Sequence, residues 1–427
     1  MTVNKIKFAP GAEISVIPTD KFKSNYFSLN FYIPLDKKIA SEVSLLSRVM
    51  TRGTVDHPSI GELNLYTDML YELTFGMNVS ALGIYQVLSF TMDYIGDRYV
   101  PAWEKESISE SAMNFMREFF LRPLVKDGAF CEEFVESEKK IVSDAIRGEI
   151  NNKDSYAAKR AKRHLIGDHP AAISPIGDLE VVSELNGAIL YQRFLKILAE
   201  ARVEVVFVGD ASGGVVDSIV SALRDILPAD RFDTAMPEPT KCFDADGDDV
   251  REIVEDIDTK QSRMILGYSL PYDVTQSHIA SVFLEIFSNS PVSRLFVNIR
   301  ERMNLCYYCT AGLDAFTGAM TIRSGMSKKN VDAARVEITR QLDDVASGNI
   351  SEDELDVSKL AIISSIKSVM DSASGLAEWY LRRLIRGCGF DLEELMEKIS
   401  QVSSDEVAGF AARAKLKMAY LLRGEEA

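Results

Sequence analysis

Cys306 and Cys309 have the C-x-x-C spacing found in metal knuckles and in redox-active dithiols. A zinc knuckle requires four ligands, and the sequence supplies neither a second C-x-x-C nor a pair of histidines to complete it. The other cysteines are Cys131, Cys242 and Cys388, and five are too few and too scattered for a disulfide framework in 427 residues. We therefore expect reduced thiols, and keep the C-x-x-C pair as a secondary candidate for metal binding or redox chemistry.

The histidines form no recognisable metal-binding motif, and the glycines form no phosphate-binding motif. The four histidines, His57, His164, His169 and His278, lack metal-site spacing such as i, i+4 with a nearby carboxylate. We expect His169 to fix a turn and His57 to lie in an Asp-His-Pro loop. The glycines at 213 and 214 lack the third glycine and the Lys-Ser/Thr of a phosphate-binding loop. No nucleophile elbow or Cys/His arrangement supports an autonomous hydrolase of another kind.

The composition excludes several partners. The chain has 64 acidic and 48 basic residues and a formal net charge of -16, which would repel nucleic acid and anionic membranes. The first residues, MTVNKIKFAPGAEISV, contain no continuous apolar region, and no later apolar run approaches the roughly 20 residues that span a bilayer. We expect a cytoplasmic protein without nucleic-acid or membrane partners.

Two halves of similar plan follow one another. Apolar residues alternate over 27–33 before Pro34, and again over 264–270 before Pro271, as in half-buried strands. A helical pattern follows each, over 37–53 and 275–299. The recurrence, 237 positions apart, indicates an internal duplication.

Long amphipathic helices are predicted in both halves, and each half closes with a late strand, over 203–210 and 417–424. Strands grouped with long helices favour an α+β fold over strict β-α alternation. The segment 227–255 is rich in Pro, Asp and Gly and is the predicted linker. The predicted domains are therefore 1–226 and 256–427.

The first predicted helix resembles the zinc-binding helix of pitrilysin/insulinase-type metallopeptidases. Residues 42–54, EVSLLSRVMTRGT, end in the Gly-Thr that follows the family's inverted motif H-x-x-E-H. Aligned on that pair, the motif falls on Ser44, Ser47 and Arg48. The family's histidines bind zinc and its glutamate activates water, so this trio removes ligands and base together. The resemblance implies a chain without zinc that cannot hydrolyse peptides alone.

Further segments carry the same resemblance through nearly the whole chain. Asp168-His169-Pro170 and Pro175-Ile176-Gly177 are similar to the family's turn into the next helix of the first half. The helix around Glu138 resembles the one that supplies the third zinc ligand, a glutamate. By that alignment the ligand position falls near Ala145. The implied fold is two homologous αβ domains, each a mixed or antiparallel sheet packed by long helices, forming a clam-shell chamber.

The segment 293–308, SRLFVNIRERMNLCYY, resembles the family's "LF..LRE..GL.Y" element of the second half. Asn304 replaces a glycine of that element and still tolerates a left-handed turn. In active members the matching arginine and tyrosine contact the substrate and the oxyanion. The resemblance therefore implies this role for Arg300 and Tyr307, whose guanidinium and phenol are both hydrogen-bond donors. Without it, a solvated helix arginine and a core tyrosine are the simpler interpretation.

A degenerate zinc helix beside a retained Arg/Tyr pair is similar to the zinc-free chain of two-chain peptidases such as the mitochondrial processing peptidase. It is also similar to a bacterial branch associated with modification of elongation factor P. The implied function is a zinc-free subunit that pairs with a homologous zinc-bearing chain, where the zinc would reside, and supplies Arg300 and Tyr307 in trans to act on peptides. The alternative is a pseudoenzyme that only binds a peptide or protein, and the isolated chain could form a homodimer.

Overall fold

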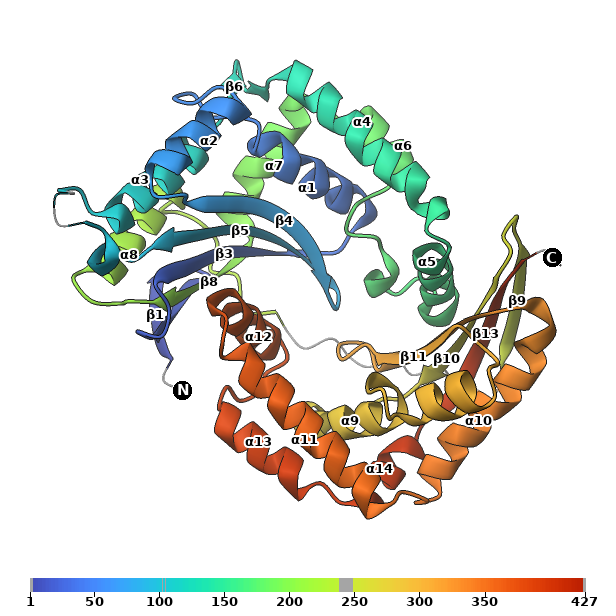
Figure 1. Cartoon of the computed structure of the whole chain (residues 1–427). Helices are drawn as coiled ribbons and strands as arrows, with labels where there is room; N and C mark the ends of the chain where they lie inside the picture. Colours follow the sequence, from blue (N-terminus) through green and yellow to red (C-terminus); the bar gives the residue numbers. More distant parts are fainter. Residues whose placement is uncertain (1–2, 102, 104, 238–248, 425–427) are drawn as a thin grey trace. The chain divides into compact units, whose positions relative to one another are not determined.

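The computed structural model describes residues 3–101, 103, 105–237 and 249–424. The chain forms two compact units, each with its own sheet (Figure 1). Unit 1 comprises Met1–Gly148, Ile173–Glu238 and Met370–Ile385. Unit 2 comprises Glu149–Ala172, Pro239–Val369 and Arg386–Ala427. Each unit holds one main sheet and several long helices, which confirms the predicted α+β class.

Unit 1 is built on a mixed sheet of order β1-β2-β8-β3-β5-β4, in which only β2 and β8 are parallel. Its strands are β1 (Asn4–Ala9), β2 (Ala12–Pro18), β3 (Ser24–Pro34), β4 (Thr74–Leu82), β5 (Tyr85–Ile95) and β8 (Arg202–Gly209), with a small hairpin of β6 (Val125–Lys126) and β7 (Ala129–Phe130). Its helices are α1 (Lys37–Met50), α2 (Ile60–Met69), α3 (Ile108–Leu121), α4 (Glu132–Gly148), α6 (Leu179–Glu184), α7 (Gly187–Glu200), α8 (Val215–Ile226) and α12 (Ala373–Ile385).

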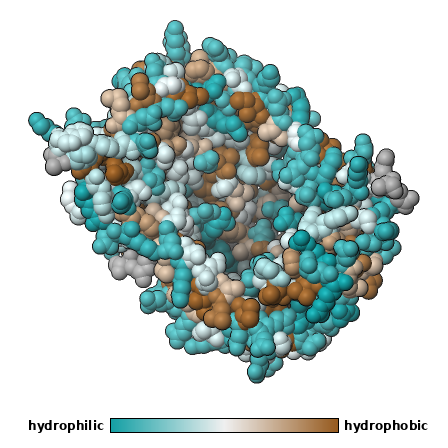
Figure 2. Space-filling model, viewed as in Figure 1, coloured by the Kyte–Doolittle hydropathy of each residue, from teal (hydrophilic) through white to brown (hydrophobic). Residues whose placement is uncertain are grey.

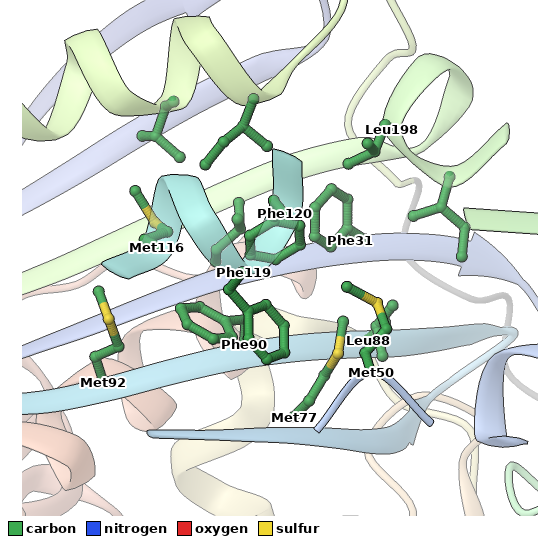
Figure 3. Packing of buried hydrophobic residues seen from close by; sticks show 14 of the residues in the cluster. Phe31, Met50, Met77, Leu88, Phe90, Met92, Met116, Phe119, Phe120 and Leu198 are labelled. Atoms are coloured by element: carbon green, nitrogen blue, oxygen red, sulfur yellow. The ribbon is translucent and has the colours of Figure 1, made fainter. Parts of the chain in front are cut away.

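The alternation of side chains along β3 decides where the core of unit 1 lies. Phe27, Leu29 and Phe31 all point to one face and are fully buried in the main hydrophobic cluster. On that face Phe90 of β5 packs against Phe119 of α3, with ring centroids 4.9 Å apart (Figure 3). The intervening residues of β3 face the other way and are polar or aromatic with hydroxyls.

Helix α1 is fixed near its N-terminal end by two specific contacts. Asp36 caps its first turn by accepting hydrogen bonds from the amides of Lys38 and Ile39. The predicted turn at Pro175-Ile176-Gly177 packs against it: Gly177 has φ +103, and a Cβ there would lie 2.7 Å from the Cα of Ser41. The next amide, of Asp178, donates to the Ser41 hydroxyl at 2.9 Å. This turn therefore holds the helix that corresponds to the family's zinc helix.

Unit 2 contains a second mixed sheet, of order β11-β12-β10-β13-β9, in which only β13 and β9 are parallel. Its strands are β9 (Arg251–Asp256), β10 (Ser262–Ser269), β11 (Tyr308–Leu313), β12 (Ala319–Met326) and β13 (Lys415–Arg423). Its helices are α5 (Lys153–Ile166), α9 (Ser277–Leu284), α10 (Val331–Ala346), α11 (Glu352–Val369), α13 (Leu392–Gln401) and α14 (Ser404–Ala411), with π-helical segments η5 (Glu285–Asn289) and η6 (Leu295–Arg302).

The two sheets share one topology. The order β2-β8-β3-β5-β4 in unit 1 corresponds to β9-β13-β10-β12-β11 in unit 2, with the parallel pair in the same place. The strands that precede Pro34 and Pro271, β3 and β10, occupy matching central positions. The matching topology supports the internal duplication read from the sequence.

Each unit also contains a helix from the other half of the sequence, so the units differ from the continuous ranges 1–226 and 256–427. Helix α5 packs on β10, β12 and β13 of unit 2, and α12 packs on β3 and β8 of unit 1. An amphipathic pattern shows that one face of a helix must be buried, but it does not show which sheet buries that face. Of the predicted linker 227–255, residues 238–248 lie outside the described residues and β9 begins at Arg251. Before that gap Arg231 is buried and donates to the carbonyl of Leu198.

The surface of the chain seen in Figure 2 is mainly hydrophilic. Hydrophilic residues cover most of the face shown in Figure 2, with apolar residues in separate patches. Among the helices that the structure describes, none is long and apolar enough to span a bilayer.

A charged cluster lies between the sheet of unit 1 and α12. Arg202 and Glu204 on β8 are both buried and paired, and the Arg202 guanidinium also lies 3.2 Å from Glu13. Beside them the hydroxyls of Ser15 and Tyr380 are hydrogen-bonded at 2.7 Å. Burial raises the pKa of Glu204 to about 7, although Arg202 acts in the opposite direction.

The raised pKa of Glu204 predicts a loss of stability with rising pH. Between its ordinary pKa of 4.5 and the folded value of about 7, the folded chain holds a proton that the unfolded chain releases. The free energy of unfolding therefore falls across this window as pH rises. Glu204→Gln should remove up to about 3 kcal/mol of that fall in thermal or urea unfolding. Glu13→Gln removes only a lesser cause of the raised Glu204 pKa, so most of the fall should remain; equal slopes for wild type and Glu204→Gln would contradict the prediction.

Candidate functional site

The residues aligned with the zinc motif lie in the C-terminal half of α1. Ser44 and Ser47 are both buried, and the Ser47 hydroxyl donates to the carbonyl of Ser44 at 2.8 Å. Ser47 is the residue aligned with the catalytic glutamate, and its hydroxyl proton is used in this hydrogen bond within the helix. Arg48 differs, because its side chain is 46% exposed and extends toward α4.

A carboxylate on α4 faces Arg48. Glu138, with a side chain only 6% exposed, lies between two guanidiniums, 3.7 Å from that of Arg48 and 3.4 Å from that of Arg52. Arg52 also donates to Ser137 at 3.1 Å and lies over the ring of Phe134. The sequence singled out the helix around Glu138 but gave no reason to pair this residue with Arg48.

Ala145, the position aligned with the third zinc ligand, lies two helical turns beyond Glu138 and is exposed. A methyl side chain cannot coordinate a metal. The carboxylate that the structure brings to the altered helix is therefore Glu138, which sequence alignment alone did not identify.

The residues at this position do not fit a zinc ion. Zinc sites in proteins use Cys, His, Asp or Glu ligands, whereas the two guanidiniums here carry fixed positive charge and have no lone pair to donate. Two cations already balance the buried carboxylate of Glu138. Within 3–101, 103, 105–237 and 249–424, no group of three or more His, Cys, Asp or Glu side chains could hold a metal ion.

Arg300 and Tyr307 flank the end of a π-helical segment in unit 2. Arg300 lies on η6, and the chain then turns through Asn304, which has φ +48. This confirms the left-handed turn expected where the family's motif has glycine. Beyond the turn the amide of Tyr307 donates to the carbonyl of Gly325 at 2.8 Å, just before β11 begins.

Both side chains are accessible. Tyr307 is 58% exposed, so it is not a core aromatic residue. The Arg300 guanidinium lies 4.8 Å from the centre of the Phe296 ring and 3.6 Å from the Glu301 carboxylate. Two hydrogen-bond donors are therefore available on the surface of unit 2.

The C-x-x-C pair is buried next to these residues. A hydrogen bond from the Cys309 thiol lowers the pKa of Cys306, and the same bond together with burial raises the pKa of Cys309. Cys131, Cys306, Cys309 and Cys388 are free thiols, as expected, and Cys242 lies outside the described residues.

The histidines have structural contacts. Nδ1 of His169 accepts from the amide of Ala171 at 3.2 Å, so this residue fixes a turn as predicted. His57 stacks on Tyr66 and is hydrogen-bonded through Nδ1 to Glu118 at 2.8 Å.

Comparison with known proteins agrees with this geometry. A family model, "Peptidase M16 inactive domain", matches residues 185–362. A Bacillus subtilis (strain 168) protein, the probable inactive metalloprotease YmfF, is 24% identical over 99% of both chains. A conserved protein from Enterococcus faecalis V583 has a structure that matches with a TM-score of 0.90 at 24% identity, over 100% of this chain and 99% of that one. The peptidase M16 inactive domain from Pseudomonas fluorescens matches with a TM-score of 0.81 at 17% identity, over 100% and 99%.

The duplicated αβ fold and the altered helix define a protein of the metallopeptidase fold that lacks the zinc motif. Residues 185–362 match the M16 peptidase family, which is the pitrilysin/insulinase type that the sequence resembles, and the comparisons support a member of that family without the zinc motif.

The purified chain should contain no stoichiometric zinc, because Ser44 and Arg48 occupy the positions of the two zinc-binding histidines and Ser47 that of the glutamate between them. Elemental analysis checks this directly. Added zinc should also leave the melting temperature unchanged, since a ligand that binds the folded state would raise it. About one tightly held zinc per chain would contradict the prediction.

Glu138→Gln should destabilise unit 1, because it leaves two guanidiniums beside a neutral amide. With Arg48 half exposed, we expect a loss of about 1–2 kcal/mol in the free energy of unfolding, below the value for a fully buried pair. Glu136→Gln, on the same helix but 59% exposed in its pair with Lys139, is the matched control and should change stability little. Equal urea midpoints for the two variants would show that the cluster has no structural role.

Proposed function

We propose that the chain is the zinc-free subunit of a two-chain peptidase. It binds an extended peptide, pairs with a homologous zinc-bearing chain and contributes Arg300 and Tyr307 to that chain's catalytic centre. The proposal includes a cytoplasmic location, consistent with the four free thiols in a reducing compartment.

The single observation that carries the proposal is the Arg48–Glu138–Arg52 cluster. It places fixed positive charge where active members bind a dication, so hydrolysis by the family's mechanism requires a second chain. The similarity in fold to a related structure over 100% of this chain supports binding surfaces that remain in use without the zinc motif.

A peptide site is supported by the edge of the sheet in unit 1. Among the described strands, β4 pairs with β5 alone, so its outer edge presents amides and carbonyls without strand partners. An extended peptide can satisfy these groups by adding a strand. Affinity would then come from main-chain hydrogen bonds, and selectivity from pockets for alternate side chains.

The contribution in trans is supported by the exposure of Arg300 and Tyr307. A guanidinium and a phenol are suited to the negative charge that develops on a carbonyl oxygen during attack by water. Tyr307 stands free of the core, and the turn at Asn304 brings it close in sequence to η6, which carries Arg300.

A second candidate function is a scaffold that only binds a peptide or protein. The contacts of Arg300 with Phe296 and Glu301 favour it, because they can be explained by local structure alone. If the isolated chain forms a homodimer, that assembly would fit the scaffold function.

Kinetics of the reconstituted pair separate the two functions. If Arg300 and Tyr307 donate to the oxyanion, Arg300→Ala or Tyr307→Phe should lower kcat by about 10²-fold or more, with little effect on assembly. Arg302→Ala is the matched control, since Arg302 lies on the same π-helical segment and contacts only Asn298 among the hydrogen bonds found there. Wild-type turnover by both test variants would exclude the role in trans, and loss of assembly with normal turnover would favour the scaffold.

A further inference from the structure

The sheet of unit 1 has a polar pocket on the face opposite its hydrophobic core. Side chains of β3, β4 and β5 form its floor and α12 forms a wall, and the cavity measures about 200 Å³. An apolar cavity of about 150 Å³ holds a benzene molecule, so this space accommodates one side chain of a peptide.

The floor consists of uncharged hydrogen-bonding groups in rows across the strands. Asn30 of β3 lies opposite Ser89 of β5, which lies opposite Asn78 of β4. The Ser89 hydroxyl donates to Asn30 Oδ1 at 2.7 Å, and Asn30 Nδ2 donates to the Ser28 hydroxyl at 3.1 Å. This network fixes the orientation of the Asn30 amide and leaves the serine hydroxyls adaptable as donors or acceptors.

The hydroxyl of Tyr32 is a hydrogen-bond donor that has no acceptor among the described residues. It is 2% exposed, lines this pocket as well as a neighbouring cavity, and its hydroxyl has no hydrogen-bond partner among the described residues. Burial also raises the pKa of Tyr32, so the phenol stays protonated at neutral pH. A buried hydroxyl without a partner carries a desolvation cost, which a ligand carbonyl in the pocket would offset.

The charged side chains that α12 contributes to the pocket form an ion pair. Glu378 and Arg382 of α12 are the charged residues that line the pocket, and Arg382 donates to Glu378 at 2.7 Å. With no free charge facing the cavity, the pocket disfavours an ionic group, which would lose hydration without gaining a counter-charge.

We propose that this pocket selects a carboxamide side chain, of asparagine or glutamine, on the bound peptide; the inference rests on the proposed peptide-binding function. A strand added at β4 places alternate side chains on the face that carries Asn78 and Ser80. A carboxamide offers a carbonyl to the Tyr32 hydroxyl and an NH₂ group to the serine and asparagine oxygens. An aliphatic side chain can hydrogen-bond neither to the Tyr32 hydroxyl nor to the serine and asparagine oxygens. A carboxylate side chain would bring a negative charge that no free positive charge in the pocket balances.

The test compares three peptides that differ only at one central residue, Gln, Glu or Leu, binding to the full chain. Wild type should bind the Gln peptide about tenfold more tightly than the others, as expected for one or two hydrogen bonds. Tyr32→Phe removes the hydroxyl without changing the ring and should reduce the preference to about threefold or less, with unchanged affinity for the Leu peptide and unchanged unfolding. Tyr94→Phe is the matched control: this residue lies on the same sheet but outside the pocket, and the preference should persist.

Equal binding of the three peptides, or an undiminished preference in Tyr32→Phe, would overturn the proposal. If no peptide binds, the proposed function fails, and the pocket is then tested with N-acetylglutaminamide by saturation-transfer NMR. A signal in wild type that is lost in Tyr32→Phe would support a carboxamide site independent of peptides. No signal in wild type would overturn the inference as well.

Discussion

The alternation of side chains along β3 is the constraint on which unit 1 depends. Successive residues of a strand point to opposite faces, so one sequence can supply a hydrophobic core and a polar surface at once. Phe27, Leu29 and Phe31 bury one face under the helices, while Ser28 and Asn30 define the other. A shift of register by one residue would exchange the faces and place amide and hydroxyl groups in the aromatic core. The packing of the core therefore fixes the position of every polar group in the pocket.

Two arginines balance a buried carboxylate beside the helix that resembles the family's zinc helix. In a zinc enzyme the dication balances the carboxylates around it, and losing the ion alone would leave buried negative charge. Here Arg48 and Arg52 provide that balance for Glu138 from within the chain. A guanidinium cannot polarise water as a metal does, but its fixed positive charge stabilises a buried carboxylate, here through ion pairs of 3.4 and 3.7 Å. The altered helix thus keeps its place against α4 while its chemistry is gone.

Local patterns in the sequence predicted much of this structure. The alternating residues before Pro34 and Pro271 identified β3 and β10, and the amphipathic pattern before Gly53 identified α1. Asn304 was expected in a left-handed turn and has φ +48. These features depend on neighbours within a few residues.

Features set by distant contacts were not predictable in the same way. The exchange of α5 and α12 between the sheets depends on which surface buries each helix, and nothing in their periodicity encodes that choice. The pairing of Glu138 with Arg48 joins two helices far apart in the sequence, and the Tyr32 hydroxyl is recognisable only once its burial is known. Such long-range pairings require the fold before the residues can be assigned.

The duplication shows that the polar pocket is not a necessary consequence of the fold. With Pro34 matched to Pro271, Ser28 corresponds to Ile265 and Asn30 to Gly267 on the equivalent face of unit 2. There α5 closes the face: Leu165 packs so near β10 that a Cβ on Gly267 would lie 2.9 Å from its methyl group, and Ile265 joins the same hydrophobic cluster. The same topology therefore accommodates a dry, apolar contact between helix and sheet. Because that simpler packing is available, the amide and hydroxyl groups kept at these positions in unit 1 are better explained by a ligand than by stability.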